Sequence, residues 1–121
     1  MSNFLHKKLP PYSTLLSGRE PRDEHGFPSE QLQIWYNHTE KTWQDQAPHY
    51  HSHSDEVFIV LSGEIIVEVE GERVTIGPGE YCCFRAGVVH HVVEVHPPVE
   101  SLMIRAPSID DKVTLEEIEN E

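Results

Sequence analysis

The chain of 121 residues is long enough for one domain whose core needs no disulfide bonds, and too short for a second core. Its formal net charge of −12, from 21 Asp and Glu against 9 Lys and Arg, argues against nucleic acid or an anionic membrane as a partner, because phosphate binding requires clustered cations. Residues 1–11 are interrupted by charges and a proline pair, and no apolar run is long enough to span a membrane, so we expect a cytoplasmic location.

The two cysteines, Cys82 and Cys83, are neighbours in the sequence. Adjacent Cα atoms lie about 3.8 Å apart, which is below the ~4.4 Å lower end for an ordinary disulfide bond. We therefore expect reduced thiols, as in a reducing compartment. In a strand one of the two side chains faces inward, either as a small apolar filler or as a redox or ligand group.

The N-terminal part of the chain predicts a surface segment followed by a strand. Residues 1–30 are rich in proline, glycine and charged side chains, which is typical of a surface segment or an edge strand. Residues 31–36 alternate in the manner of a half-buried strand. Residues 37–46 are polar and turn-prone but contain Trp43, which either packs as a plug or contacts a substrate at the rim of a barrel.

The middle of the chain predicts several short strands. Residues 57–61 are all apolar, so both faces of this strand must be covered, and we predict a homodimer that partly buries the outer face. Residues 64–70 alternate between apolar and mostly acidic side chains, which indicates an antiparallel strand with one buried face. Turn signals then separate further strands at residues 73–76, 81–84, 88–95 and 101–104. This rhythm of short strands and turns indicates a β-sandwich or barrel.

The C-terminal residues predict a short helix. The run Thr114-Leu115-Glu116-Glu117 has the capping-box pattern that begins many helices. A helix of this length is stable only when it is docked against the rest of the protein. The single domain is therefore expected to comprise a surface segment or edge strand at 1–30, a barrel at 31–107, and a short helix or tail at 108–121.

Histidines and carboxylates crowd into the eight residues that end at Glu56. If this segment is extended, His49 and His51 point to one face, and Glu56 can join them across a short turn. Because Glu56 opens an apolar strand, an unpaired charge there would be costly, and a bound cation would relieve that cost. Two imidazoles and one carboxylate suit Fe, Mn, Ni, Co or Zn.

Two alternatives stay open for this segment. The histidines could belong to a solvated loop with no metal. The ligands could also be His51, His53 and Glu56, since His53 has the same parity as the other two histidines.

The order and spacing of these residues resemble the two conserved motifs of the cupin superfamily. The first motif is matched by His49-x-His51, four residues, Glu56, six residues and Gly63. The second is matched by Gly79, five residues, Arg85-Ala86-Gly87, two residues, His90, three residues and Glu94. Three positions depart from the usual pattern: Arg85 stands in place of proline, Glu94 in place of asparagine, and Trp43 in place of a frequent glycine.

The resemblance covers residues 43–96, and it implies a fold and a metal site. The implied fold is all-β, a double-stranded β-helix or jelly-roll barrel, here with the short C-terminal helix added. The implied cofactor is one divalent transition metal, Fe, Mn, Ni, Co or Zn, held by His49, His51, Glu56 and His90. Such a site usually keeps one or two positions open for water or substrate.

Other polar residues are candidates for chemistry at the barrel mouth. If its strand is regular, Glu94 shares a face with His90 and could act as a general acid or base inside the barrel; if the strand bulges, Glu94 is exposed. Arg105 could bind a substrate carboxylate or form a salt bridge. Tyr36 and Trp43 complete the expected substrate contacts.

The resemblance favours a metal-dependent oxidoreductase of the dioxygenase type that acts on a small organic molecule. A metal-assisted isomerase, epimerase or lyase acting on a sugar or small acid is an alternative from another reaction class. A non-catalytic module that binds or senses a small molecule is the third.

Overall fold

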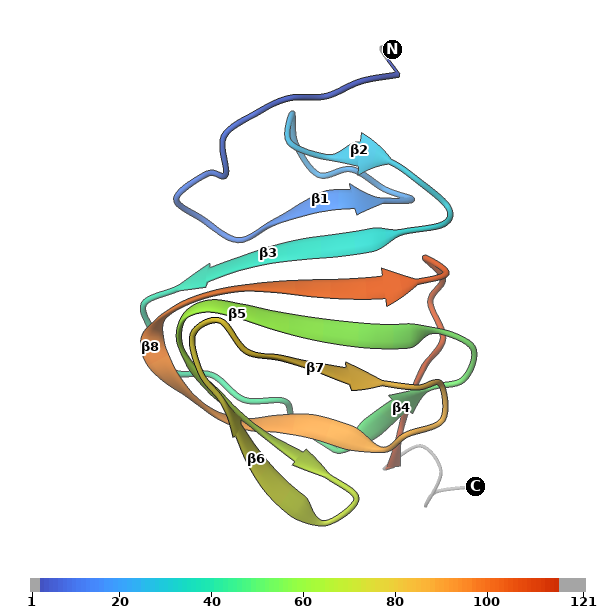
Figure 1. Cartoon of the computed structure of the whole chain (residues 1–121). Helices are drawn as coiled ribbons and strands as arrows, with labels where there is room; N and C mark the ends of the chain where they lie inside the picture. The colour runs from blue at the N-terminus through green and yellow to red at the C-terminus, as the bar shows by residue number, and fades with distance from the viewer. Residues whose placement is uncertain (1–2, 116–121) are drawn as a thin grey trace.

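The computed structural model describes residues 3–115 and folds them into a curved β-sheet that closes into a barrel (Figure 1). Within this range the elements are nine strands: β1 Thr14–Gly18, β2 Phe27–Pro28, β3 Gln33–Thr39, β4 His49–His51, β5 Asp55–Val69, β6 Glu72–Ile76, β7 Tyr81–Phe84, β8 His90–Ala106 and β9 Lys112–Thr114. The all-β jelly-roll expected from the sequence is confirmed.

Two long antiparallel strands, β5 and β8, form the frame of the barrel. They pair from Asp55 opposite Ala106 to Val69 opposite His90, and both bend as they cross the molecule (Figure 1). The other free edge of β8 pairs with β3 and with β4, while β5 pairs with β6 and β7. Each of the two long strands therefore contributes to both halves of the barrel.

The core lies between these strands and is made of β-branched and aromatic side chains. Its buried members are Val60, Ile65, Val67, Ile76, Phe84, Val92, Val95 and Val99. Such residues fit the pleated surface of a sheet and lose little side-chain freedom there. The core fills one end of the barrel and leaves the end near β4 to polar groups.

A register shift in β8 decides which of its side chains face inward. Ile66 lies opposite Glu94 and Val67 opposite Val92, so one extra residue, Val93, is inserted in β8. Because a bulge reverses the alternation of side chains, Val92 and Val95 are both buried while Glu94 is exposed.

The N-terminal segment extends the sheet beyond β3. Strand β1 pairs antiparallel with β3, and the short β2 pairs parallel with β1. Leu15 in β1 is buried, which anchors the segment. Strand β3 thus lies between β1 and β8, and β1 ends at the same side of the barrel as β8 (Figure 1).

Among residues 3–115 the short C-terminal helix is not seen as an element. Residues 112–114 form strand β9, which pairs with β4 and matches His49 with Thr114 and His51 with Lys112. Strand β4 pairs with β8 only through His49, so most of its backbone needs another partner, and β-branched Val113 and Thr114 suit a strand. Residues 116–121, where most of the helix was expected, lie outside the described residues.

The structure also bears on the expectations about a membrane span and about the two cysteines. In the described part of the chain no helix is long and apolar enough to cross a membrane. Cys82 is half-buried and Cys83 exposed, and neither forms a disulfide bond. Burial raises the pKa of the Cys82 thiol to about 12, so the thiol stays protonated at neutral pH and behaves as an apolar filler.

Gly63, at an irregular point of β5, provides a test of the frame. Its φ is +78°, and an added Cβ would lie 2.7 Å from Val99 Cγ2 and in contact with the Pro98 carbonyl oxygen. Gly63→Ala should therefore lower the free energy of unfolding by about 2–4 kcal/mol, from left-handed strain plus overpacking. Denaturant unfolding measures this value.

Gly79→Ala is the matched control. Gly79 has a similar φ of +80°, but an added Cβ would meet no atom within 4 Å. Its cost should be limited to the backbone strain, about 1–2 kcal/mol. Equal costs for the two variants would show that the close approach of Gly63 to Val99 is unimportant.

Candidate metal centre

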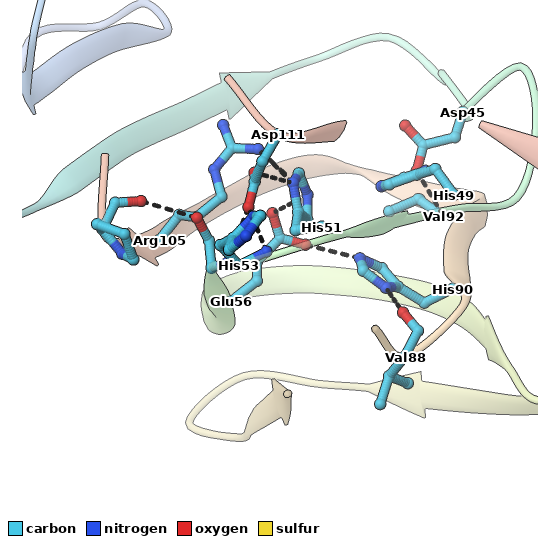
Figure 2. Close-up of polar contacts among 12 residues, drawn as sticks. Asp45, His49, His51, His53, Glu56, Val88, His90, Val92, Arg105 and Asp111 are labelled. Carbon is cyan, nitrogen blue, oxygen red and sulfur yellow. Dashed lines mark hydrogen bonds and ion pairs between the residues drawn. The ribbon is translucent and has the colours of Figure 1, made fainter. Parts of the chain in front are cut away.

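Three strands bring four potential metal ligands to one point. His49 and His51 lie on β4 with Tyr50 between them, so both imidazoles point to the same side. Glu56 is the second residue of β5, and His90, the first residue of β8, pairs directly with His49. All four side chains are buried, with 2–5% of their surface exposed (Figure 2).

The spacing of this cluster suits a single ion. One ligand atom from each of the four residues lies within 4.8 Å of all the others. Two ligands of one transition metal are at most about 4.4 Å apart, because each bond is roughly 2.0–2.2 Å long. The cluster therefore needs only a small contraction to surround an ion.

The hydrogen bonds of the three histidines favour metal binding through Nε2. Nδ1 of His90 lies 2.9 Å from the Val88 carbonyl oxygen, and Nδ1 of His49 lies 3.3 Å from that of Ala47. Nδ1 of His51 lies 3.1 Å from Oδ1 of Asp111. Since each acceptor requires a proton on Nδ1, Nε2 is the nitrogen that each imidazole can offer to a metal ion.

The carboxylate of Glu56 faces Nε2 of two of these histidines. Its Oε1 lies 2.7 Å from His90 Nε2, and its Oε2 lies 3.2 Å from His51 Nε2. Burial raises the pKa of Glu56, but the hydrogen bonds with His51 and His90 outweigh burial and lower that pKa to about 2. A metal ion held by these residues would take the place of the Nε2 protons that Glu56 accepts, so the donor set fits a cation.

Packing fixes the orientation of the cluster. The His90 ring stacks on Phe84 with 4.0 Å between ring centroids and 3° between planes. Burial, and then the nearby His90, lower the pKa of His49 to about 4, so the His49 ring is neutral at physiological pH. A neutral, preoriented imidazole is the form that binds a metal.

Asp111 holds His51 in place from the C-terminal end of the barrel. One carboxylate oxygen contacts His51 Nδ1, and the other accepts hydrogen bonds of 2.8 Å from the backbone N–H groups of His53 and Ser54. Burial raises the pKa of Asp111, but these hydrogen bonds outweigh burial and lower it. The ionised side chain therefore fixes both the tautomer of His51 and the turn that leads to Glu56.

Three members of the cluster, His49, His51 and Glu56, line a cavity of about 310 Å³. Its walls combine aromatic, apolar and charged side chains: Trp35, Asn37, Trp43, Asp45, Phe58, Val92, Met103, Arg105 and Lys112. Arg105 Nη1 lies 3.0 Å from Nδ1 and 3.1 Å from Nε2 of His51, so the guanidinium packs against the imidazole (Figure 2). The cavity places two cations beside the cluster.

The other residues singled out in the sequence are placed as follows. Trp43 and Arg105 line the cavity. Tyr36 is buried on the opposite face of β3 from Trp35 and Asn37, where its hydroxyl lies 3.0 Å from Glu100 Oε2. His53 is exposed and outside the cluster, so the alternative ligand set with His53 is not the one that the structure brings together.

Glu94 does not reach the cavity. Its exposed carboxylate lies 3.1 Å from His96 on the outer surface, because the bulge at Val93 turns it outward. The structure therefore corrects the inward position that regular alternation predicted for Glu94. The exposed position expected for a bulged strand is the one observed.

Sequence reasoning did not single out Asp45, Trp35 or Asp111. Strand alternation places Tyr36 on one face of β3 and Trp35 on the other, so the sequence pattern could equally have indicated Trp35 as the residue that faces the site. Asp45 lies in a polar loop where its chain neighbours give no signal. Asp111 contacts His51 across sixty residues, a pairing that no local pattern predicts.

Asp111→Asn tests the orientation of His51. The amide oxygen can still accept the two backbone hydrogen bonds, but its NH₂ group then faces His51 Nδ1 and favours the tautomer with a proton on Nε2. We expect metal affinity to fall by roughly 10–100-fold, as for other groups that orient a metal ligand. Titration of the metal-stripped protein with Co²⁺, followed by its visible absorption, measures the affinity.

His53→Gln is the matched control, because His53 is adjacent in the chain but lies outside the cluster. Its affinity for Co²⁺ should equal that of the wild type. Unchanged affinity in Asp111→Asn, with a circular dichroism spectrum like that of the wild type, would refute the orienting role of Asp111.

Comparison with known proteins identifies the family. Residues 38–104, more than half of the chain, match the cupin domain family. An uncharacterized protein of Aquifex aeolicus is 33% identical over 67 residues, a match that spans 55% of this chain and 55% of that protein. The chain thus matches about half the length of this curated relative.

Solved structures agree on the fold. Pac13 from Streptomyces, a nucleoside dehydratase solved with uridine, has a TM-score of 0.62 at 15% identity, over 74% of this chain and 72% of its own. The DMSP lyase DddQ from Ruegeria pomeroyi has a TM-score of 0.61 at 22% identity, over 84% of this chain and 50% of its own. At such identities the likeness concerns the fold alone; with the match to the domain family, it shows that this chain belongs to the cupins.

Proposed function

We propose that the protein is a metal-dependent lyase that eliminates a leaving group, such as water, from a small organic anion. The observation that carries the proposal is the composition of the cavity. Three members of the buried cluster, His49, His51 and Glu56, line it, and the cations Arg105 and Lys112 lie on its wall. This combination is suited to holding a carboxylate or a similar oxyanion beside a metal ion.

His49, His51, Glu56 and His90 would hold the metal, one Fe, Mn, Ni, Co or Zn ion. When bound, such an ion supplies Lewis acidity, which stabilises negative charge that develops on a substrate oxygen. Arg105 and Lys112 bind the anionic group of the substrate, and the indoles of Trp35 and Trp43 pack against its apolar part. These contacts orient the substrate and exclude water from it.

Asp45 is the residue we propose to move the proton. It is the acidic side chain of the cavity wall outside the cluster, and one oxygen of its carboxylate accepts a 2.8 Å hydrogen bond from the Val92 N–H group. That bond holds the carboxylate at the wall and leaves the other oxygen available. Asp45 can then remove a proton from the carbon next to a carboxylate as a general base.

The comparisons support elimination chemistry in this fold. Pac13 is described as a nucleoside dehydratase and DddQ as a DMSP lyase. Both names denote the loss of a leaving group from a small molecule. For this chain, which shares only their fold, the reaction class is part of the proposal.

A dioxygenase-type oxidoreductase is the second candidate. The set of three imidazoles and one carboxylate favours it, because redox metals such as Fe and Mn accept the same mixed ligands. It differs from the lyase in requiring a redox-active metal and oxygen. A module that binds or senses a small molecule would show neither activity.

The two enzymatic candidates are separated by the metal and by oxygen. We expect the protein reconstituted with redox-inert Zn²⁺ to convert small hydroxy acids into unsaturated products without oxygen, as followed by NMR. Glu56→Gln should lose the metal and the activity together. Oxygen uptake that occurs only with Fe or Mn would favour the oxidoreductase, and ligand binding without turnover would favour the binding module.

Asp45→Asn isolates the proton transfer. Its amide oxygen can still accept the bond from Val92, so metal content should be unchanged while turnover falls by roughly 10²–10⁴-fold, the usual contribution of a general base. Glu94→Gln removes the same charge from the outer surface and should leave turnover unaltered. A larger loss in Glu94→Gln than in Asp45→Asn would reverse the assignment.

We also propose that the protein forms a homodimer through the outer face of β5 and β7. Leu61 and Tyr81 on this face are 44% and 71% exposed, an apolar surface that a second copy would cover. Leu61→Lys should shift the protein toward monomer in light scattering at micromolar concentration. Leu32→Lys is the matched control, since Leu32 is 45% exposed in a loop elsewhere. A monomeric wild type would contradict the proposal.

A further inference from the structure

A second and larger cavity adjoins the metal centre. It has a volume of about 510 Å³ and lies between the loop after β1, the start of β3, and residues 105–110. Trp35 and Arg105 line both cavities, so the two are neighbours that share a wall. A substrate held at the metal centre can therefore extend past these two side chains into the second cavity.

Arginines are concentrated around this second cavity. The chain has five arginines, and three of them, Arg19, Arg22 and Arg105, line it. Among residues 3–115 none of these three forms an ion pair with a carboxylate, whereas Arg73 on the opposite end of the barrel pairs with Glu68. In a chain with a net charge of −12, guanidinium groups left without a carboxylate partner indicate a place for an external anion.

Two further observations on Arg22 and Arg105 support an anion site at this cavity. The guanidinium carbon of Arg22 lies 5.2 Å from the centroid of the Trp35 ring, so the wall between the cavities orients this cation. Nε of Arg105 is a buried donor with no hydrogen-bond partner. Since Arg105 lines both cavities and its Nε is not held by an acceptor of the protein, its outer nitrogens are the ones that can meet a ligand oxygen.

We infer that the cavity of Arg19, Arg22 and Arg105 is a subsite for an oxyanion at the far end of the substrate. The inference rests on the proposed function for the near end. It defines the substrate class as a small molecule with two polar ends, one held at the metal centre and the other carrying a carboxylate or phosphate group. Glu20 and Asp110 also line the cavity and provide acceptors for hydroxyl groups between the two ends.

The subsite can be tested without turnover or metal. Metal-stripped protein is titrated with inorganic phosphate and, separately, with acetate, while amide and indole signals are followed by NMR. We expect saturable shifts at the Trp35 indole and the Arg19–Arg22 backbone. Arg22→Gln should weaken this binding by roughly tenfold, since one charge-assisted contact is lost. Phosphate and acetate distinguish the two forms of oxyanion.

Arg73→Gln is the matched control, because it removes the same charge from an exposed site outside the cavity. Its anion affinity should equal that of the wild type. If Arg22→Gln and Arg73→Gln weakened anion binding equally, the effect would come from net charge alone, and the subsite would be overturned. Anion binding that does not saturate, or that shifts no Trp35 signal, would overturn it as well.

A second measurement separates this inference from the proposed function. In protein loaded with Zn²⁺, a molecule with two anionic ends, such as glutarate or 3-phosphoglycerate, should bind at least tenfold more tightly than acetate, and Arg22→Gln should remove this advantage. If metal removal abolishes the tighter binding of the two-ended anion but phosphate still binds, the subsite is supported, even when the protein shows no elimination activity. Equal affinities of glutarate and acetate in wild type would show that the two cavities do not act together.

Discussion

The arrangement depends on one contact, the ionised carboxylate of Glu56 buried against the Nε2 atoms of His51 and His90. Nδ1 of each imidazole bonds elsewhere, to Val88 or to Asp111. Nε2 of each ring therefore meets the carboxylate through a proton, in a region that excludes water and where electrostatic interactions are strong. A metal ion bound by these residues would take the place of those protons. The groups lie within reach of one ion because β4, β5 and β8 constrain their backbones independently.

The pairing of strands explains why the site is built where it is. The first residue of β8 lies opposite β4, and Glu56 is the second residue of β5, so the four cluster residues meet at one end of the barrel while valines fill the other. Short β4 depends on β9 for most of its backbone hydrogen bonds. Because the residue that precedes β9 is Asp111, the same C-terminal segment both completes the sheet and orients His51. Stability and ligand geometry are in this way coupled.

The barrel and the clustering of His49, His51, Glu56 and His90 could be predicted because they leave signals in the sequence. Alternation in residues 64–70 and the spacing of His49, His51 and Glu56 are properties of adjacent residues. The inward position of Glu94 was wrong because a single bulge reverses parity, and Val93 shows nothing in its side chain that marks one. Asp111 was missed because its partner is sixty residues away. Contacts that depend on how distant segments meet are determined by the assembled sheet and leave no periodic trace.

The distribution of charge separates what the fold requires from what a ligand requires. In residues 3–115 the acidic side chains are spread over loops and strands, most of them at exposed or half-buried positions where they interact weakly with one another through water and salt. The cations are fewer, and Arg19, Arg22, Arg105 and Lys112 gather around two adjoining cavities. Neighbouring cations repel one another and contribute nothing to packing that leucine or methionine could not provide. Their position beside the buried cluster of His49, His51, Glu56 and His90 supports the proposed anionic substrate, which the negative surface elsewhere would direct to this end of the barrel.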